Sequence, residues 1–152
     1  MNSYWTWHQF SDLANEQVYE MLAMRQQVFV VEQRCPYQDF DSLDQDAWHL
    51  LGRSEPDKIA AYARLLAPDT RYPEPSIGRV LVCQLARGRG LGRQLIGHCL
   101  EKSAELYPAN PVRISAQVYL ERFYREFGFE PVGEPYDDDG MPHRTMVRSV
   151  GG

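Results

Sequence analysis

The sequence predicts one globular domain of the α/β (α+β) class, in which helices connect the strands of a sheet and cover it. Three observations support this class. The chain has 152 residues, the usual length of one domain, so residues 1–152 are treated as one unit. Hydrophobic residues make up 43% of the chain and aromatic residues 12%, which argues against a disordered protein. Runs with strand periodicity alternate with segments of helical periodicity, and no repeat or linker separates them.

The chain is predicted to begin with a strand and a helix. Residues 4–10 alternate large and polar side chains, which is typical of a half-buried strand. From Asn15, a residue that can cap a helix, apolar side chains recur near helical spacing as far as Phe29. Cys35-Pro36 and the acidic stretch DFDSLDQD then mark a loop.

The rest of the chain continues this alternation. Two apolar runs, residues 48–53 and 59–66, flank turn-forming residues at 55–57 and predict a hairpin. The proline-rich stretch APDTRYPEPS predicts a loop before the next strand. The elements predicted after it are a strand over 77–83, a helix over 92–107, a strand over 112–117, a short helix over 120–127 that Gly128 can end, and strands over 129–132 and 144–150 around the turn DDDG.

Charge and cysteine content narrow the class of protein. The formal charge of −5 gives no general reason to bind nucleic acid or an anionic membrane. Cys35, Cys83 and Cys99 form neither a C-x-x-C pair nor an even-numbered set, which favours reduced thiols. No apolar run approaches the length of a membrane span, and the first residues lack a signal-peptide pattern. We expect a cytoplasmic protein.

The stretch ARGRGLGRQL, residues 86–95, is the first candidate binding site. It precedes the predicted helix, whose first backbone N–H groups lack intrahelical partners and favour an anion. Glycines allow positive φ angles and close approach of a ligand to the backbone. The glycines are Gly88, Gly90 and Gly92, and the arginines that add charge are Arg87, Arg89 and Arg93. A plain glycine-rich connection with solvated arginines is the alternative.

Two known phosphate motifs do not match this stretch. A P-loop requires Lys and then Ser or Thr after its last glycine, and Gly92 is followed by Arg93 and Gln94. A dinucleotide-binding motif requires G-x-G-x-x-G and an acidic residue after the next strand, but this chain has G-x-G-x-G and ends that strand in Ala116-Gln117. A nucleotide-binding module is therefore disfavoured.

A third motif does match. Arg87-x-x-Gly90-x-Gly92 after the strand Val80-Leu81-Val82 resembles the acyl-CoA loop of the GNAT N-acetyltransferase superfamily. The later segment LERFYREFGF resembles a second motif of that superfamily. The stretches LAMRQQVFVVEQRCPYQDFDSLDQDAWHLLG, SAQVYLERFY and YDDDGMPHRTM resemble its ElaA-like branch, so the resemblance covers nearly the whole chain. It implies a strongly bent mixed sheet of about seven strands, flanked by about four helices and splayed where the thioester enters.

The resemblance also implies a ligand and its contacts. Acetyl-CoA is the expected co-substrate, and the strand Val80-Leu81-Val82 is expected to pair through its backbone with the pantetheine arm. A backbone N–H of that strand, with Val82 as the first candidate, would stabilise the oxyanion. Tyr119 would contact the co-substrate or fill space. The loop residues expected to bind the pyrophosphate are Arg87, Gly88, Arg89, Gly90, Leu91 and Gly92. Many members of the superfamily form dimers, so a homodimer is an open expectation.

Transfer of an acetyl group to an amine requires an acid and a base. The resemblance assigns Tyr124 as the general acid, since a phenol with a pKa near 10 is protonated at neutral pH. The spacing of Tyr124 alone would equally fit the apolar stripe of its helix. Many relatives carry a glutamate base on the strand before the loop, where this chain has Arg79. The candidate bases are Glu32, His49 and His143, although a lone histidine is more often structural.

Two acidic segments suggest the charge of the acceptor. The resemblance implies that the early loop with Asp39 and Asp41 and the turn at residues 137–139 both border the acceptor channel, and carboxylates there would favour a positively charged amine. A solvated turn is the simpler interpretation of residues 137–139. Leu43 and Asp44 occupy positions where a calcium loop from Asp39 needs Asp or Asn and then Gly, so no metal site is predicted.

The sequence therefore predicts an acetyl-CoA-dependent N-acetyltransferase. It would act on a small-molecule or peptide amine without a covalent enzyme intermediate, because no base is visibly paired with a cysteine. A non-catalytic acyl-CoA-binding or sensing domain is the alternative, since an intact phosphate loop would serve both functions.

Overall fold

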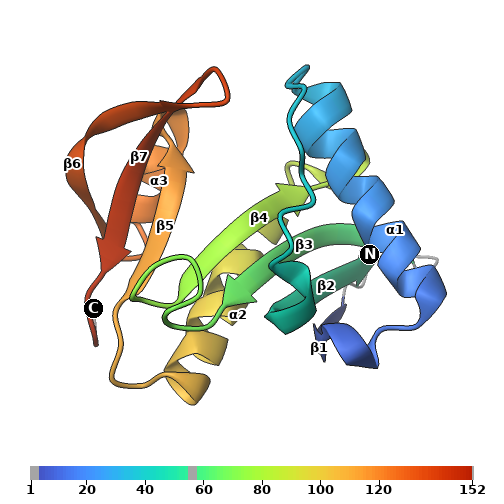
Figure 1. The fold of residues 1–152 in the computed structure, drawn as a ribbon, viewed down its shortest axis with the longest axis horizontal. Helices are drawn as coiled ribbons and strands as arrows, with labels where there is room; N and C mark the ends of the chain where they lie inside the picture. Colours follow the sequence, from blue (N-terminus) through green and yellow to red (C-terminus); the bar gives the residue numbers. More distant parts are fainter. Residues whose placement is uncertain (1–3, 55–57, 152) are drawn as a thin grey trace.

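The computed structural model describes residues 4–54 and 58–151, and these residues form a mixed sheet of seven strands. The sheet order is β1-β2-β3-β4-β5-β7-β6, and all neighbouring strands are antiparallel except the parallel pair β4 and β5. The strands are β1 (Tyr4–Gln9), β2 (Trp48–Ser54), β3 (Lys58–Leu66), β4 (Ser76–Val82), β5 (Val112–Gln117), β6 (Phe129–Asp138) and β7 (Met141–Arg148). The predicted class and strand number are confirmed (Figure 1).

The helices number three in the described part of the chain, one fewer than the resemblance implied. They are α1 (Asn15–Arg25), α2 (Leu91–Leu106) and α3 (Glu121–Arg125). The predicted first helix is longer than α1 because the chain continues as a π-helical segment over Gln26–Glu32. Gln17 rather than Asn15 caps α1: its side-chain oxygen accepts the backbone N–H of Ala14 at 2.8 Å.

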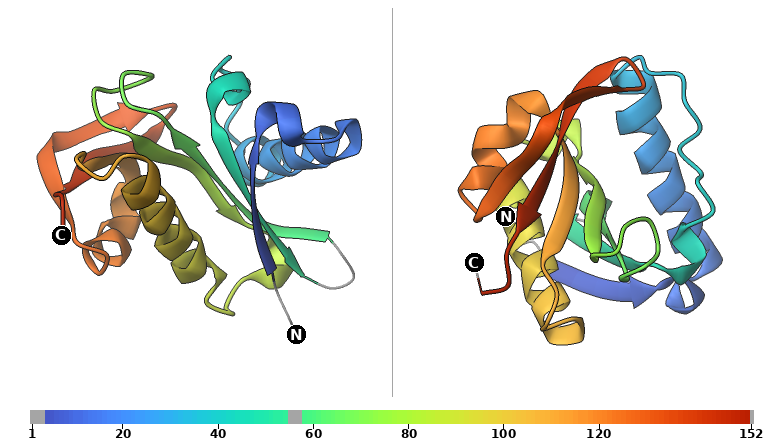
Figure 2. Two further views of the ribbon diagram at one scale, coloured as in Figure 1. Left: turned by 90° about the horizontal axis from the view of Figure 1, so that it is seen from below. Right: turned by 60° about the vertical axis from the view of Figure 1, so that its left-hand side comes forward.

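The two faces of the sheet carry separate apolar clusters. The helix α2 packs on one face and α1 on the other (Figures 1 and 2). The α2 side buries Leu91, Leu95, Ile96 and Cys99 against Leu50, Ala61, Ala63, Leu65 and Ile77. The α1 side buries Met21 and Val28 against Leu51, Ile59, Tyr62 and Leu81. Strands buried on both faces explain why residues 59–66 form a nearly continuous apolar run rather than alternating.

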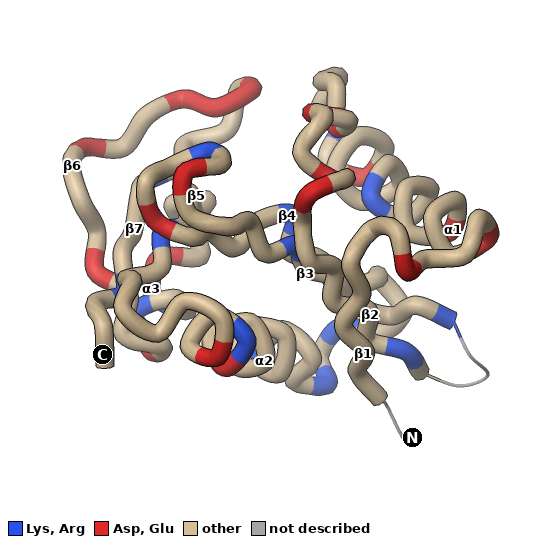
Figure 3. The backbone as a smooth tube through the Cα atoms, turned by 60° about the horizontal axis from the view of Figure 1, so that its bottom comes forward, with Lys and Arg blue, Asp and Glu red and all other residues tan. Residues whose placement is uncertain are grey.

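The last hairpin is longer than predicted. β6 continues to Asp138 and β7 begins at Met141, so the turn is Asp139-Gly140, with φ angles of 51° and 83°. Positive φ at both central residues is typical of a tight hairpin turn, and glycine allows it without strain. The tip is acidic, as Figure 3 shows. The turn predicted at residues 55–57 lies outside the described residues.

The sheet separates between β4 and β5. These strands pair in register at Ser76 and Arg113, and Pro75 accepts the Arg113 N–H at 3.0 Å. Beyond this point β5 pairs with β7 and β4 pairs with β3. The two halves diverge toward the ends of the two strands, as the view in Figure 2 also shows.

A bulge interrupts β4 beside this separation. Tyr62 of β3 pairs with Leu81 of β4, and Arg64 pairs with Gly78. The two residues Arg79 and Val80 therefore lie opposite the single residue Ala63. Arg79 has a φ angle of 50°, which is an unfavourable conformation for any residue with a side chain. Interactions of its side chain must therefore offset the backbone strain.

Candidate active site

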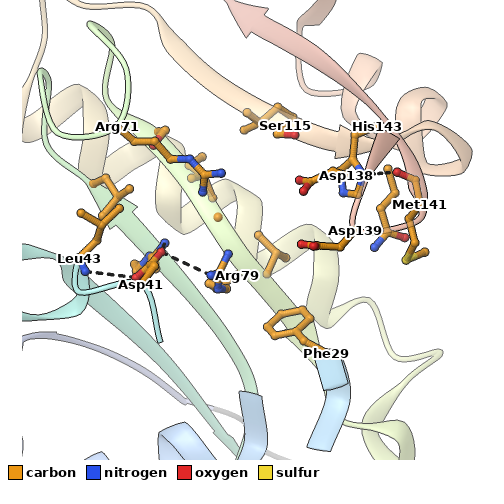
Figure 4. A pocket seen from close by; sticks show the side chains of 18 of the residues that line it. Phe29, Asp41, Leu43, Arg71, Arg79, Ser115, Asp138, Asp139, Met141 and His143 are labelled. Atoms are coloured by element: carbon orange, nitrogen blue, oxygen red, sulfur yellow. Dashed lines mark hydrogen bonds and ion pairs between the residues drawn. The ribbon is translucent and has the colours of Figure 1, made fainter. Parts of the chain in front are cut away.

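A cavity of about 660 Å³ occupies the separation between β4 and β5. Gly78, Arg79 and Val80 of β4 line it on one side, and Ser115 and Gln117 of β5 line it on the other. Its remaining walls are the segment that follows α1, the loop of residues 67–75, α3 and the β6–β7 hairpin (Figure 4). A space of this size accommodates a small organic ligand.

Six charged side chains form a closed ring at the floor of the cavity, which we call the charge ring. Arginines and aspartates alternate around it, and each aspartate contacts two arginines. The contacts are Arg25–Asp39 at 2.9 Å, Asp39–Arg79 at 2.7 Å, Arg79–Asp41 at 3.4 Å, Asp41–Arg64 at 2.7 Å, Arg64–Asp44 at 3.0 Å and Asp44–Arg25 at 2.7 Å.

Asp41 and Asp44 of the charge ring stay ionised although the ring is largely buried. The side chains of Arg25 and Arg64 are 0% and 1% exposed. Burial opposes ionisation of Asp41, but the hydrogen bond and charge of Arg64 outweigh it and hold the pKa of Asp41 well below its usual value. Arg25 and Arg64 lower the pKa of Asp44 in the same way. Burial of these groups is tolerated because each charge has a partner.

The charge ring joins four parts of the chain to one another. Arg25 ends α1, the aspartates belong to the loop after it, Arg64 lies on β3 and Arg79 on β4. The guanidinium of Arg79 also donates to the backbone oxygen of Asp39 at 3.0 Å. These contacts hold the β4 bulge in its strained conformation. They also correct the expectation for Asp39 and Asp41, whose charges pair with arginines and are not available to an amine.

His49 is fully buried and does not line the cavity. Its Nε2 lies 2.9 Å from the carbonyl oxygen of Asp44, which can only accept, so Nε2 carries the proton. Its Nδ1, 2.6 Å from the Tyr62 hydroxyl, then accepts the Tyr62 O–H. Burial lowers the pKa of His49 below its usual 6.5. The structure thus places this candidate base in a structural role, with its lone pair already used.

Glu32 lies at the end of the π-helical segment and also outside the cavity lining. Its carboxylate contacts the guanidinium of Arg87 at 2.6 Å, while the Arg87 Nε donates to the backbone oxygen of Val82 at 2.9 Å. Arg93 is paired as well, with Glu126 at 2.7 Å. Two of the three loop arginines are therefore held by protein carboxylates.

Tyr124 and His143 do line the cavity. Tyr124 is 7% exposed, and burial raises the pKa of its phenol above the usual 10. The Nδ1 of His143 lies 2.9 Å from the carbonyl oxygen of Met141, so Nδ1 is the protonated nitrogen of the neutral ring. The rings of Tyr136 and His143 are stacked with their centroids 6.3 Å apart, and the Tyr136 hydroxyl forms a hydrogen bond with the Ser115 hydroxyl. These contacts leave Nε2 of His143 as the nitrogen with a free lone pair.

The glycine loop has the conformation expected of an anion site. Gly88 and Gly90 have φ angles of 85° and 79°, and an added Cβ at either would meet open space. Gln94 donates to the Gly90 oxygen at 3.3 Å, so the amides of residues 91–93 precede the first intrahelical bond of α2. Leu91 itself is buried in the core, and its amide rather than its side chain would face a ligand.

Other predicted residues lie elsewhere. Tyr119 is 72% exposed and does not line the cavity, whereas Leu81 is buried on the α1 face. Burial raises the pKa of the Cys83 and Cys99 thiols, so both disfavour the nucleophilic thiolate. Cys35 donates its S–H to the Asp139 carbonyl at 3.1 Å and thereby links the loop after α1 to the hairpin tip.

Sequence reasoning missed the charge ring and Gln117. A signal for the ring is present, because Arg25, Arg64 and Arg79 each stand within an apolar segment, where an unpaired arginine would be costly. The side-chain oxygen of Gln117 is buried at the cavity wall without a hydrogen-bond partner among the described residues. It can accept a hydrogen bond from a ligand.

Neither a metal-ligating cluster nor a helix that could span a membrane occurs within residues 4–54 and 58–151. No group of three or more His, Cys, Asp or Glu side chains there is arranged to hold a metal ion. In the same ranges, none of the helices combines the length and apolar character needed to cross a membrane.

Comparison with known proteins identifies the family. Residues 9–150 match the acetyltransferase (GNAT) domain. The chain belongs to the GNAT family. It is 45% identical to the ElaA protein of Escherichia coli over 142 residues, which cover 92% of each chain. The crystal structure of E. coli ElaA has a TM-score of 0.91 over 97% of this chain and 100% of its own.

A second solved structure supports acyl transfer as the activity of this GNAT fold. It is an acyl-CoA N-acyltransferase from Pseudomonas aeruginosa, 40% identical, with a TM-score of 0.92 over 97% of this chain and 100% of that chain. A UPF0039 protein of Synechocystis is 52% identical over 96% of this chain and 95% of its own. The expected ElaA-like GNAT relationship is confirmed, and the protein is an acyltransferase of this family.

The charge ring should dominate the stability of this GNAT domain. Arg64→Met removes one partner from the buried carboxylate of Asp44 and one from the partly buried carboxylate of Asp41, so we expect the free energy of unfolding to fall by about 3–5 kcal/mol. Arg125→Gln is the matched control, because its ion pairs with Glu121 and Glu130 are exposed and such pairs contribute about 1 kcal/mol or less. Urea denaturation measures both. Similar losses in the two variants would contradict a dominant ring.

His49 should make stability depend on pH. In the unfolded chain His49 has its usual pKa of 6.5, whereas in the folded protein its pKa is lower. Between the two pKa values the unfolded state therefore binds more protons than the folded state. The free energy of unfolding should therefore decrease as pH falls from about 7 toward 5. His49→Gln should reduce this slope, leaving the part due to His8, whose pKa burial also lowers. An unchanged slope in urea denaturation would argue against a neutral His49.

Proposed function

We propose that this protein transfers an acetyl group from acetyl-CoA directly to an amine, without a covalent enzyme intermediate. The observation that carries the proposal is the position of Tyr124 and His143 in one cavity beside the separated edge of β4. Acetyl-CoA supplies an activated thioester when bound. The protein must then bind it, hold an amine near it, and manage two protons.

The gap between β4 and β5, together with the N-terminus of α2, fits the co-substrate. Positive φ angles at Gly88 and Gly90 curve the loop so that backbone amides at the N-terminus of α2 can bind the pyrophosphate. The edge of β4 that faces β5 beyond Ser76 can pair with the pantetheine arm. The oxygen of Gln117 adds an acceptor for an amide N–H at the same place.

Tyr124 is suited to the role of general acid. Because burial raises the pKa of its phenol, the proton stays bound at neutral pH. The phenol can therefore donate a hydrogen bond to the departing CoA thiolate and pass its proton to it as the C–S bond breaks. Edge-to-face contacts with Phe123 at 5.2 Å and Phe129 at 5.9 Å fix the ring.

His143 is our candidate for the general base in preference to His49 and Glu32. Its Nδ1 proton is held by Met141, so Nε2 can accept the proton of the amine directly or through a water. For the oxyanion we propose the backbone N–H of Val80, which lines the cavity at the bulge. Val82, the first candidate from sequence, does not line the cavity, and its carbonyl is bonded to Arg87.

Gly90→Val should weaken acetyl-CoA binding. A Val side chain disfavours the φ angle of 79° and displaces the amides, so we expect roughly a tenfold or greater rise in the dissociation constant by calorimetry. Gly133→Val is the matched control: its φ is 78°, it meets the same open space, and it lies on β6 away from the loop. Both variants should lose similar thermal stability. If the two variants bind CoA with equal affinity per folded molecule, the glycine loop has a structural role and does not bind the co-substrate.

Tyr124→Phe should slow acetyl transfer while leaving binding intact. We expect kcat to fall roughly 10²-fold and the dissociation constant of acetyl-CoA to change less than about twofold, as for loss of a general acid. Tyr19→Phe on α1, 78% exposed, is the control. CoA release in an amine-library screen measures the rate. Tight acetyl-CoA binding with no accelerated acceptor would instead favour the non-catalytic sensing domain.

A further inference from the structure

The charged groups of the cavity divide into two sets. Asp41, Arg64 and Arg79 belong to the charge ring and balance one another. The remaining carboxylates and guanidinium that line the cavity are those of Arg71, Asp138 and Asp139. These three, together with His143, are the groups with which a ligand can pair.

Arg71 forms one wall of the cavity. Its side chain extends from the loop of residues 67–75 into the open space, as Figure 4 shows, and no carboxylate of the described residues forms an ion pair with it. Its guanidinium carbon lies 5.7 Å from the centroid of the Tyr72 ring. The guanidinium carbon of Arg113 lies 4.7 Å from the same centroid. Arg113 is in turn paired with Glu74 at 3.4 Å. These contacts brace the loop against β5, and the loop presents the Arg71 cation to the cavity.

Asp138 and Asp139 form the opposite wall. Both carboxylates point from the β6–β7 hairpin toward the cavity in Figure 4, and within the described residues neither has a lysine or arginine partner. The backbone of Asp139 is held by the S–H of Cys35 at 3.1 Å. His143 lies on the same hairpin, so the acidic wall and the candidate base face the ligand together.

Opposite walls of opposite charge specify a ligand that carries both charges. A simple amine would pair with Asp138 and Asp139 but would leave the Arg71 cation facing a desolvated ligand without an anion. A carboxylate offers the planar, two-oxygen partner that a guanidinium binds best. We propose that the acceptor bears a carboxylate in addition to its amine, and that it is a free amino acid, the smallest ligand that carries both groups. This inference rests on the transferase function proposed above.

Paired ligands test the proposal by binding alone. Calorimetry on the protein saturated with CoA would compare amino acids with the amines that lack their carboxylate: lysine with 1,5-diaminopentane, leucine with 3-methylbutylamine, phenylalanine with 2-phenylethylamine and histidine with histamine. At least one amino acid should bind roughly tenfold or more tightly than its partner, as expected for a charge-assisted pair. If no amino acid binds more tightly than its amine, the proposal is wrong.

Variants locate the two ends of the ligand. Arg71→Gln should weaken the amino acid roughly tenfold and leave its amine within about twofold, which removes the preference. Asp138→Asn with Asp139→Asn should weaken both members of the pair, because both carry the amine. Arg122→Gln and Glu134→Gln, exposed and outside the cavity lining, are the matched controls and should change neither. Equal effects of Arg71→Gln on amino acid and amine would overturn the assignment of Arg71.

Turnover separates this inference from the proposed function. If CoA release is observed with amines but shows no preference for a carboxylate, the transferase function stands and the amino-acid acceptor is wrong. If the preferred amino acid binds but is never acetylated, the assignment of Arg71, Asp138 and Asp139 to a ligand with both charges stands, while the transferase function and the role of that ligand as acceptor are wrong.

Discussion

Arg25, Arg64 and Arg79 alternate with Asp39, Asp41 and Asp44 in a closed ring, and the geometry of the cavity depends on it. The ring has no net charge and no free end, so burial is compensated at every member. It fastens the end of α1 and the loop after it to β3 and β4. It also holds Arg79 at a positive φ, and with it the bulge that brings Val80 to the cavity. A local backbone distortion is thus maintained by contacts between residues far apart in sequence.

The same ring separates structural charge from functional charge. Because its three aspartates are matched by three arginines, the field inside the cavity is set by a few groups that the fold leaves uncommitted. These groups lie on the loop of residues 67–75 and on the β6–β7 hairpin, which are connections rather than core strands. The framework can therefore stay fixed while these connections determine which acceptor is bound.

Local signals explain which features the sequence could predict. Periodicity located the strands and α2, because alternation and helical spacing report burial of one face. The spacing around Gly90 indicated a loop of unusual backbone conformation before α2, and Gly88 and Gly90 do have positive φ angles, which favour glycine; its binding of phosphate stays a prediction. The ring could not be predicted, because its members are adjacent in space alone. His49 was a candidate base on residue type, and spacing does not show that Asp44 and Tyr62 use both of its nitrogens. The periodicity also predicted the three helical regions, but it could not show that the first of them passes from α1 into a π-helical segment, since hydrogen-bond register has no clear sequence signal.

The separation of β4 from β5 opens the sheet between the face covered by α2 and the face covered by α1. The glycine loop, for which we propose binding of the co-substrate, belongs to the first side, and the segment after α1 borders the cavity on the second. Donor and acceptor can therefore enter by different routes and be held at once, with neither blocking the other's exit. For direct transfer this favours sequential kinetics through a ternary complex, in which initial-rate plots intersect rather than run parallel.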